Sequence, residues 1–94
     1  MGKESVIETA VCTYAKGKGF YVRKFKAPGN RGVPDRIFLS PSGVWFTIEF
    51  KAPGGKTTAL QNREKALIER NNGRCYVVDN VEYGREIIES YVII

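Results

Sequence analysis

GVPD at residues 32–35 and EFK at residues 49–51 are the two segments that decide how this chain is expected to fold. Apolar runs at 37–39 and 44–48 lie between them, separated by the turn-forming residues of 40–43, Ser-Pro-Ser-Gly. Two apolar runs joined by such a turn predict a β-hairpin. The two short polar segments therefore fall at the same end of one hairpin.

The register of this hairpin decides which side chains meet across it. Side chains two residues apart on a strand share a face, so Glu49 and Lys51 point the same way while Phe50 points into the opposite layer. A turn of five residues, 40 to 44, places Asp35 opposite Glu49, with Cβ atoms about 5 Å apart. A turn of four residues places Ile48 there instead, because a slip of one residue moves every side chain to the other face.

Two facing carboxylates favour a hard divalent cation. They repel each other, and without a partner one of them has a raised pKa and takes up a proton. Mg²⁺ is held by one or two carboxylates and keeps several waters, which suits a site that acts on phosphate. The chain has no histidine, so a histidine-based zinc or copper site is excluded. Lys51 can then position an attacking water or stabilise negative charge, and these residue types indicate hydrolysis.

Pro34-Asp35 followed by Glu49-Phe50-Lys51 resembles the PD-(D/E)XK nuclease signature. RGVPDR at residues 31–36 and EFKAPGG at residues 49–55 resemble its VRR-Nuc branch, and the similarity spans nearly the whole chain. A bare D…ExK pattern is weak, whereas the longer strings with a following Gln61 are far more specific. The resemblance implies a nuclease of DNA that depends on Mg²⁺ or Mn²⁺, in the form of a stand-alone minimal module. It also implies a backbone carbonyl ligand from Phe50 and an active-site role for Gln61.

Composition is consistent with a small globular protein that meets polyanions. The 94 residues predict one domain, 1–94, and the net charge of +5 favours nucleic acid without requiring it. Cys12 and Cys75 have no CxxC companion and are expected to be reduced thiols in the core. No apolar run is long enough to span a membrane and no secretory segment is visible, so we expect an intracellular, soluble protein of the cytoplasm.

The first helix, expected over residues 5–16, offers a further candidate ligand. Ser5 and Glu8 have the S-x-x-E spacing of a capping box. Glu8 can therefore simply cap the helix, or it can reach the metal, as a first-helix glutamate does in many nucleases that this chain resembles. Glu4, one turn earlier, is the reserve candidate.

The remaining elements complete an α/β architecture. We expect strands over 20–25 and 75–79, a helix from Thr57 or Thr58 to about residue 72, and a last helix over 83–91. The order αβββαβ follows, with a mixed central sheet flanked by helices, as in the restriction-endonuclease-like core that the resemblance implies. Gln61 lies in the first turn of the second helix, where it is either part of the site or a solvent-facing residue. Because both faces of the hairpin carry apolar residues, we expect the sheet to be covered on both faces.

Cations gather around the hairpin, where contacts to phosphate are most useful. The alternative is an ordinary solvated face. The candidates for DNA contacts are Lys24, Lys26, Arg31, Arg36 and Lys56.

The sequence thus predicts a magnesium-dependent DNA endonuclease in which Asp35, Glu49 and Lys51 carry the chemistry and Glu8 and Gln61 complete the site. Glu8 and the Phe50 carbonyl are further candidate metal ligands. We expect a homodimer acting on branched DNA, such as a four-way (Holliday) junction, paired through residues 91–94 or the aromatic residues of the first strand. The alternatives are a non-catalytic nucleic-acid-binding module of the same fold and a small Mg²⁺-binding structural or regulatory subunit.

Overall fold

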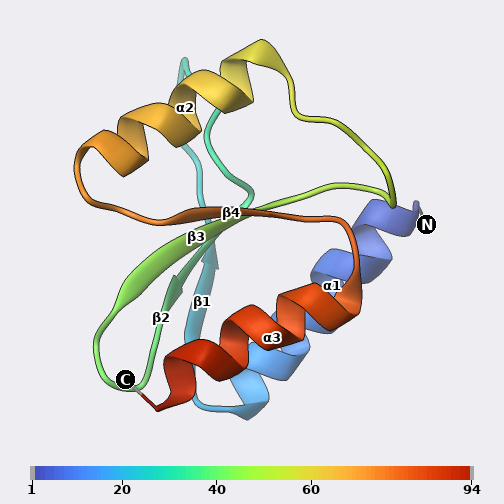
Figure 1. Cartoon of the computed structure of the whole chain (residues 1–94), viewed down its shortest axis with the longest axis vertical. Helices are drawn as coiled ribbons and strands as arrows, with labels where there is room; N and C mark the ends of the chain where they lie inside the picture. The colour runs from blue at the N-terminus through green and yellow to red at the C-terminus, as the bar shows by residue number, and fades with distance from the viewer. Residues whose placement is uncertain (1, 94) are drawn as a thin grey trace.

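A computed structural model describes residues 2–93 and contains one four-stranded sheet and three α-helices. The elements follow one another in the predicted order αβββαβ, and the predicted last helix follows them (Figure 1). Their bounds are α1 Lys3–Gly17, β1 Tyr21–Lys24, β2 Arg36–Leu39, β3 Trp45–Phe50, α2 Ala59–Arg70, β4 Cys75–Val78 and α3 Val81–Val92.

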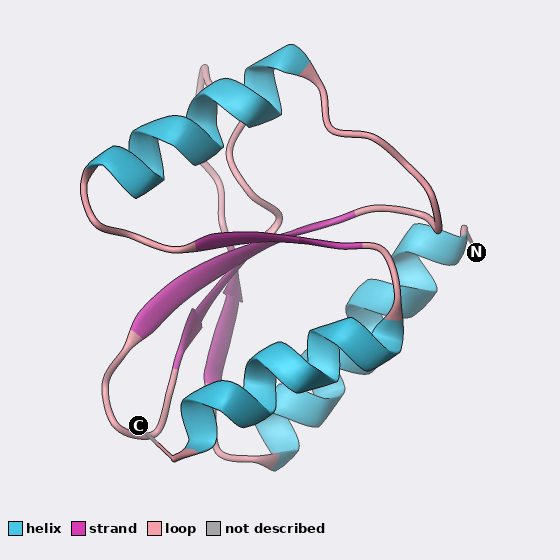
Figure 2. Ribbon diagram, in the orientation of Figure 1, coloured by secondary structure: helices cyan, strands magenta, loops and turns pink. Residues whose placement is uncertain are grey.

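The sheet is mixed, as predicted. Its strands lie in the order β1-β2-β3-β4, in which β2 pairs antiparallel with both β1 and β3, and β4 pairs parallel with β3. Helix α2 connects β3 to β4, because two parallel neighbours need a crossover rather than a tight turn. Figure 2 shows α1 and α3 side by side on one face of the sheet and α2 on the other face.

The core lies between the sheet and the pair α1 and α3. Phe38, Phe46, Ile48 and Phe50 are at most 2% exposed, and all four point to this face of β2 and β3. The ring of Phe46 stacks on Phe38 at a centroid distance of 5.0 Å and on Tyr91 of α3 at 4.1 Å. Full burial of such side chains stabilises the fold by about 1.5–3 kcal/mol each relative to exposure.

Helices α1 and α3 pack closely where Gly84 meets Val11. A Cβ at Gly84 would collide with the Val11 side chain, so the absence of a side chain is what lets the two helices approach. The α3 N-terminus is capped by Asn80, whose Oδ1 accepts the Tyr83 N–H at 2.7 Å. Helix α3 is longer than the predicted 83–91 at both ends, and Ile93, which follows it, is 90% exposed.

The predicted capping box of Ser5 and Glu8 is wrong. Helix α1 begins at Lys3 with Gly2 as its N-cap, and the Gly2 carbonyl accepts the Val6 N–H at 3.2 Å. Ser5 instead lies inside the first turn and donates its hydroxyl to the Gly2 carbonyl at 2.9 Å. Glu8 is therefore free of any capping role.

The prediction that both faces of the sheet are covered is only partly correct. Helix α2 packs mainly against β4 and has no fully buried side chain. The part of this face formed by β1, β2 and the start of β3 stays open, with Tyr21 47% exposed and Trp45 53% exposed. Their rings pack edge to face at a centroid distance of 6.3 Å. We call this open part of the α2 face the aromatic patch, and it consists of Tyr21, Leu39 and Trp45.

Both cysteines are buried and free, as predicted. Burial raises the pKa of the Cys12 thiol to about 11, which keeps it protonated at neutral pH. Within residues 2–93, no helix is both long enough and apolar enough to cross a membrane.

Candidate active site

The register of β2 and β3 places Asp35 opposite Glu49. Arg36 pairs with Ile48 and Phe38 with Phe46, so the next position outward joins Asp35 and Glu49. The turn closes between Ser40 and Val44, where the Ser40 N–H donates to the Val44 carbonyl at 2.9 Å. The five-residue turn is therefore confirmed, and the alternative that put Ile48 opposite Asp35 is excluded.

The loop before Asp35 is fixed against α2 by a glycine. A Cβ at Gly32 would collide with the backbone carbonyl group of Leu60, in the first turn of α2. At the other end of the loop, the Phe25 N–H donates to the Asp35 carbonyl at 3.1 Å and extends the pairing of β1 with β2. Gly32 thus allows the loop to pack against α2, and this position of the loop places Asp35 directly before β2.

Asp35 is held by the strand that carries its partner. Its Oδ2 accepts the Phe50 N–H at 2.7 Å, which fixes the carboxylate beside the end of β3. Burial raises the pKa of Asp35, and the nearby carboxylates of Glu8 and Glu4 raise it further, while the Phe50 N–H acts in the opposite direction. The Phe50 ring is fully buried on the other face, so only its backbone borders the site.

Glu49 is a buried carboxylate with one unpaired oxygen. The residue is 5% exposed, and its Oε2 accepts a hydrogen bond from Gln61 Nε2 at 2.8 Å. Its Oε1 has no hydrogen-bond partner among the described residues. Burial, followed by the negative charge of Asp35, raises the pKa of Glu49 to about 7. Such an oxygen costs free energy unless a cation or a proton occupies it.

Gln61 reaches the site while capping its own helix. Thr58 is the N-cap of α2, and its Oγ1 accepts the Gln61 N–H at 3.2 Å. The Gln61 Oε1 in turn accepts the Thr58 N–H at 2.9 Å, which leaves the side-chain NH₂ group to donate to Glu49. The capping box thus orients the amide toward Glu49, and Gln61 is not a solvent-facing helix residue.

Lys51 stands next to Glu49 on the same face, as strand alternation predicted. Its Nζ lies 3.7 Å from Glu49 Oε2, and its side chain is 13% exposed. The Lys51 N–H donates to the Val78 carbonyl at 2.8 Å, which ties the end of β3 to β4. The ammonium group lies beside Glu49, and its positive charge acts against the rise in pKa of both Glu49 and Asp35.

Glu8 approaches the site from the other face of the sheet. Its Oε2 accepts a hydrogen bond from Arg36 Nε at 2.6 Å, and both side chains are about one-fifth exposed. Glu8 nevertheless borders the same hollow as Asp35. The structure thus brings Asp35, Glu49, Lys51 and Gln61 together and sets Glu8 apart, bound to Arg36.

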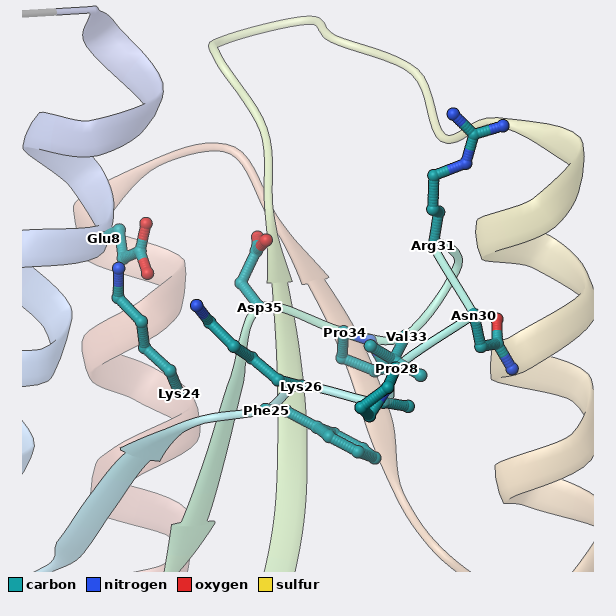
Figure 3. A pocket seen from close by; sticks show the side chains of 11 residues that line it. Glu8, Lys24, Phe25, Lys26, Pro28, Asn30, Arg31, Val33, Pro34 and Asp35 are labelled. Carbon is teal, nitrogen blue, oxygen red and sulfur yellow. The ribbon is translucent and has the colours of Figure 1, made fainter.

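A hollow of about 550 Å³ lies beside Asp35 (Figure 3). Three of the predicted DNA contacts, Lys24, Lys26 and Arg31, line it. Lys24 and Lys26 extend toward Glu8 on one side, while Asn30 and Arg31 lie on the other side, next to α2. Lys56 is exposed in the loop between β3 and α2, outside this hollow.

Sequence reasoning missed the ion pair of Arg36 with Glu8 and the presence of Phe25 in the hollow. Arg36 follows Asp35 directly, so strand alternation already indicates that the two side chains face opposite sides. Phe25 lies beyond the end of β1, and only the register of β1 with β2 shows that it is the neighbour of Asp35. The candidate DNA contacts were chosen by their distance from the hairpin in the sequence, which shows neither the ion pair of Arg36 nor the position of Phe25.

Comparisons with known proteins agree with this geometry. No protein-family model matches the chain. Among curated proteins, it is similar to "Putative nuclease p44" of Acyrthosiphon pisum secondary endosymbiont phage 1, with 37% identity over 78 residues that cover 83% of this chain and 84% of the relative. Among solved structures, it is similar to one described as "VRR_NUC domain", with a TM-score of 0.88, 26% identity, and coverage of 97% of this chain and 99% of that one.

The relative shares more than a third of its aligned residues with this chain over most of both lengths, and the solved domain has the same fold. The residues that carry the sequence resemblance also lie together at the end of one hairpin. We conclude that the chain belongs to the VRR-Nuc family.

Proposed function

We propose that the chain is a metal-dependent endonuclease that hydrolyses phosphodiester bonds in DNA. The observation that carries this proposal is the unpaired Oε1 of Glu49, buried opposite Asp35. A buried, unsatisfied carboxylate beside a second carboxylate is costly to the fold, and such arrangements cluster at functional sites.

The residues present fit a divalent cation. Among residues 2–93 no three His, Cys, Asp or Glu side chains form a metal-binding group, and the two carboxylates that face each other at the end of the hairpin are Asp35 and Glu49. Mg²⁺ commonly binds through one or two carboxylates and keeps several waters. Mn²⁺ prefers similar oxygen ligands and is expected to substitute. We therefore assign Asp35 and Glu49 as ligands, with the Phe50 carbonyl as a third.

Each residue of the site then has a role. Asp35 and Glu49 would hold the cation, which when bound would offset phosphate charge and supply a water of lowered pKa as the nucleophile. Gln61 holds the Glu49 carboxylate in one orientation through its amide. Lys51, at 3.7 Å from Glu49, holds an ammonium group where it can position water or stabilise the charge that develops on the phosphate.

DNA contacts are proposed for the cations that border the site. Lys24, Lys26 and Arg31 line the hollow beside Asp35, and Lys56 lies in the exposed loop after β3. The net charge of +5 supports attraction to a polyanion. Arg36 is bound to Glu8, so we propose that it holds Glu8 in place rather than contacting phosphate as predicted.

We also propose that the enzyme acts as a homodimer on branched DNA. The aromatic patch lies on the same sheet face as Glu49, and Arg23 stacks over Tyr21 at 4.3 Å, so the patch presents flat apolar surface with a cationic rim. Exposed apolar clusters of this kind often mark interfaces. Two protomers related by a two-fold axis would carry two active sites at a fixed spacing, which suits paired strands of a four-way junction.

The deciding experiment measures cleavage of linear, flapped and four-way DNA with and without Mg²⁺. We expect cleavage only with the metal, and none from Asp35→Asn, whose side chain keeps the shape of the carboxylate. Tight DNA binding without cleavage by the wild-type chain under any metal condition would instead support the non-catalytic binding module.

The oligomeric state is tested by sedimentation of the wild-type chain at micromolar concentration. Trp45→Lys is expected to shift a dimer toward monomer and to reduce cleavage of the junction more than cleavage of linear duplex. Ile93→Lys tests the C-terminal surface, the other predicted interface, since Ile93 is 90% exposed. Ile94, the last residue of that surface, lies outside the described residues. A wild-type monomer that cuts both substrates equally would refute the dimer.

A further inference from the structure

The hollow beside Asp35 has a lining that phosphate hydrolysis does not require. Besides its charged residues, its wall contains an apolar group made of Phe25, Ala27, Pro28, Val33 and Pro34. Its volume of about 550 Å³ lies within the range of about 300–1,000 Å³ that is usual for small-molecule sites. A contact to backbone phosphate alone needs cations and does not use an apolar wall.

Phe25 places an aromatic ring in the same hollow as Asp35. The pairing of Lys24 with Arg36 continues to Phe25 and Asp35, whose backbones are joined by a hydrogen bond of 3.1 Å. Directly paired residues on neighbouring strands project to the same face. Figure 3 shows the Phe25 ring extending from the end of β1 toward the loop that carries Pro28, and the residue is only half-buried.

Polar groups surround this apolar wall. Among residues 2–93, none of the cations Lys24, Lys26 and Arg31 forms an ion pair, so all three can bind an anion. The Oδ1 of Asn30 accepts the Gly32 N–H at 3.2 Å, which leaves the side-chain NH₂ group to donate to a ligand. The hollow therefore combines a flat apolar wall, one hydrogen-bond donor and a cationic rim.

We propose that this hollow binds one unpaired nucleotide of the DNA substrate, next to the phosphate that is cut. The base lies against Phe25 and the prolines, Asn30 donates to its edge, and the lysines contact its phosphate. A base in a duplex would have to leave its stack to enter the hollow. The free-energy cost of this movement is lowest for a base that is already unpaired. The proposal rests on the proposed function and gives the site a substrate class, which is DNA with an unpaired nucleotide at the cleavage point.

Binding is measured in chelator, so that no cleavage occurs and the proposed nuclease activity is not needed. The probes are a duplex with a single unpaired 2-aminopurine and the same duplex fully paired. We expect wild type to prefer the unpaired probe and to quench its fluorescence. Loss of one base–aromatic stack weakens binding by about 5- to 150-fold. Phe25→Leu is therefore expected to lose both the preference and the quenching.

Three controls separate stacking from folding. Phe25→Trp keeps a flat ring and should retain the preference and the quenching. Tyr83→Leu removes an aromatic ring that is 40% exposed on α3, away from the hollow, and should behave as wild type. Thermal melting of each variant shows that it is folded.

The outcomes are distinct for the two proposals. Equal affinity of wild type for both probes, or unchanged quenching in Phe25→Leu, would overturn the nucleotide site even if Mg²⁺-dependent cleavage is found. Conversely, quenching that depends on Phe25 in a chain that never cuts DNA would keep the nucleotide site and overturn the nuclease.

Discussion

From Phe46 onward both faces of β3 are buried, but they contain opposite kinds of side chain. Phe46, Ile48 and Phe50 point toward α1 and α3 and are at most 2% exposed. Thr47 and Glu49 point toward α2 and are 6% and 5% exposed. Burying hydrocarbon stabilises the fold, while burying a carboxylate costs free energy unless it is paired. One face of β3 therefore stabilises the core, while the other face carries the buried carboxylate of the candidate active site.

The largest expected effect is a loss of DNA cleavage when the carboxylates on the polar face are replaced. Asp35→Asn and Glu49→Gln should each reduce cleavage below detection, because the proposed cation would lose a charged ligand, while DNA binding stays similar or becomes tighter. Cleavage of labelled duplex and binding in chelator are measured on the same preparations. Glu86→Gln, exposed on α3, is the matched control and should cut as wild type does. Normal cutting by either site variant would remove the distinction between the faces.

Substitutions on the apolar face should instead lower the stability of the fold. Phe38 is fully buried and stacks on Phe46, so Phe38→Ala should lower the free energy of unfolding by about 3–5 kcal/mol. Trp45→Ala, on the open part of the other face, should cost less than about 1 kcal/mol. Urea unfolding at concentrations where the chain is monomeric compares them. A larger loss for Trp45→Ala would show that the aromatic patch belongs to the core.

The next effect concerns Lys51, which lies on the polar face but carries a positive charge. Lys51→Ala should lower the single-turnover rate by about 10²-fold, a typical loss for one catalytic group, with little change in DNA affinity. Rate and affinity are measured separately for this reason. A change in affinity alone would make Lys51 an ordinary phosphate contact.

How much of the site follows from sequence depends on how local each relation is. The facing of Asp35 and Glu49 could be predicted, because period-two alternation and one turn length determine it. The orientation of Gln61 could be foreseen only in part. Its place in the first turn of α2 is local, but its bond to Glu49 depends on how the crossover returns to β3.

Relations between distant elements were the ones that sequence reasoning missed. Glu8 was weighed as a cap or a metal ligand, yet its partner is Arg36, 28 residues away and on a different element. The predicted start of α1 was too late, because its N-cap is Gly2. Glycine has no side chain that could form a recognisable capping motif in the sequence. The aromatic residues of the first strand were expected to offer exposed surface, but the contribution of Leu39 and Trp45 to the aromatic patch was missed, because apolar strand residues do not reveal how far a single helix extends over the sheet.

The smallest expected effect is a pH dependence that comes from the polar face alone. Glu49 has an ordinary pKa of 4.5, which burial beside Asp35 raises to about 7 in the folded chain. Between these values the folded chain holds a proton that the unfolded chain releases, so the free energy of unfolding falls as pH rises through this window. Above pH 7 the loss is complete, because Glu49 is then charged in both states. Each unit of pKa corresponds to about 1.4 kcal/mol, so we expect a loss of about 1–3 kcal/mol.

Glu49→Gln tests this, because glutamine resembles the protonated carboxyl and cannot titrate. Unfolding is measured in chelator at pH 5 and pH 8, and the wild-type chain should lose about 1–3 kcal/mol more between them than the variant does. Glu86→Gln should follow the wild type. Adding Mg²⁺ at pH 8 should raise the melting temperature of the wild-type chain and leave that of Glu49→Gln nearly unchanged, because the ion binds only the folded carboxylates. If the wild-type chain and Glu49→Gln show the same pH dependence and the same response to Mg²⁺, then burial does not raise the pKa of Glu49. The carboxylate on the polar face of β3 would then not lower the free energy of unfolding.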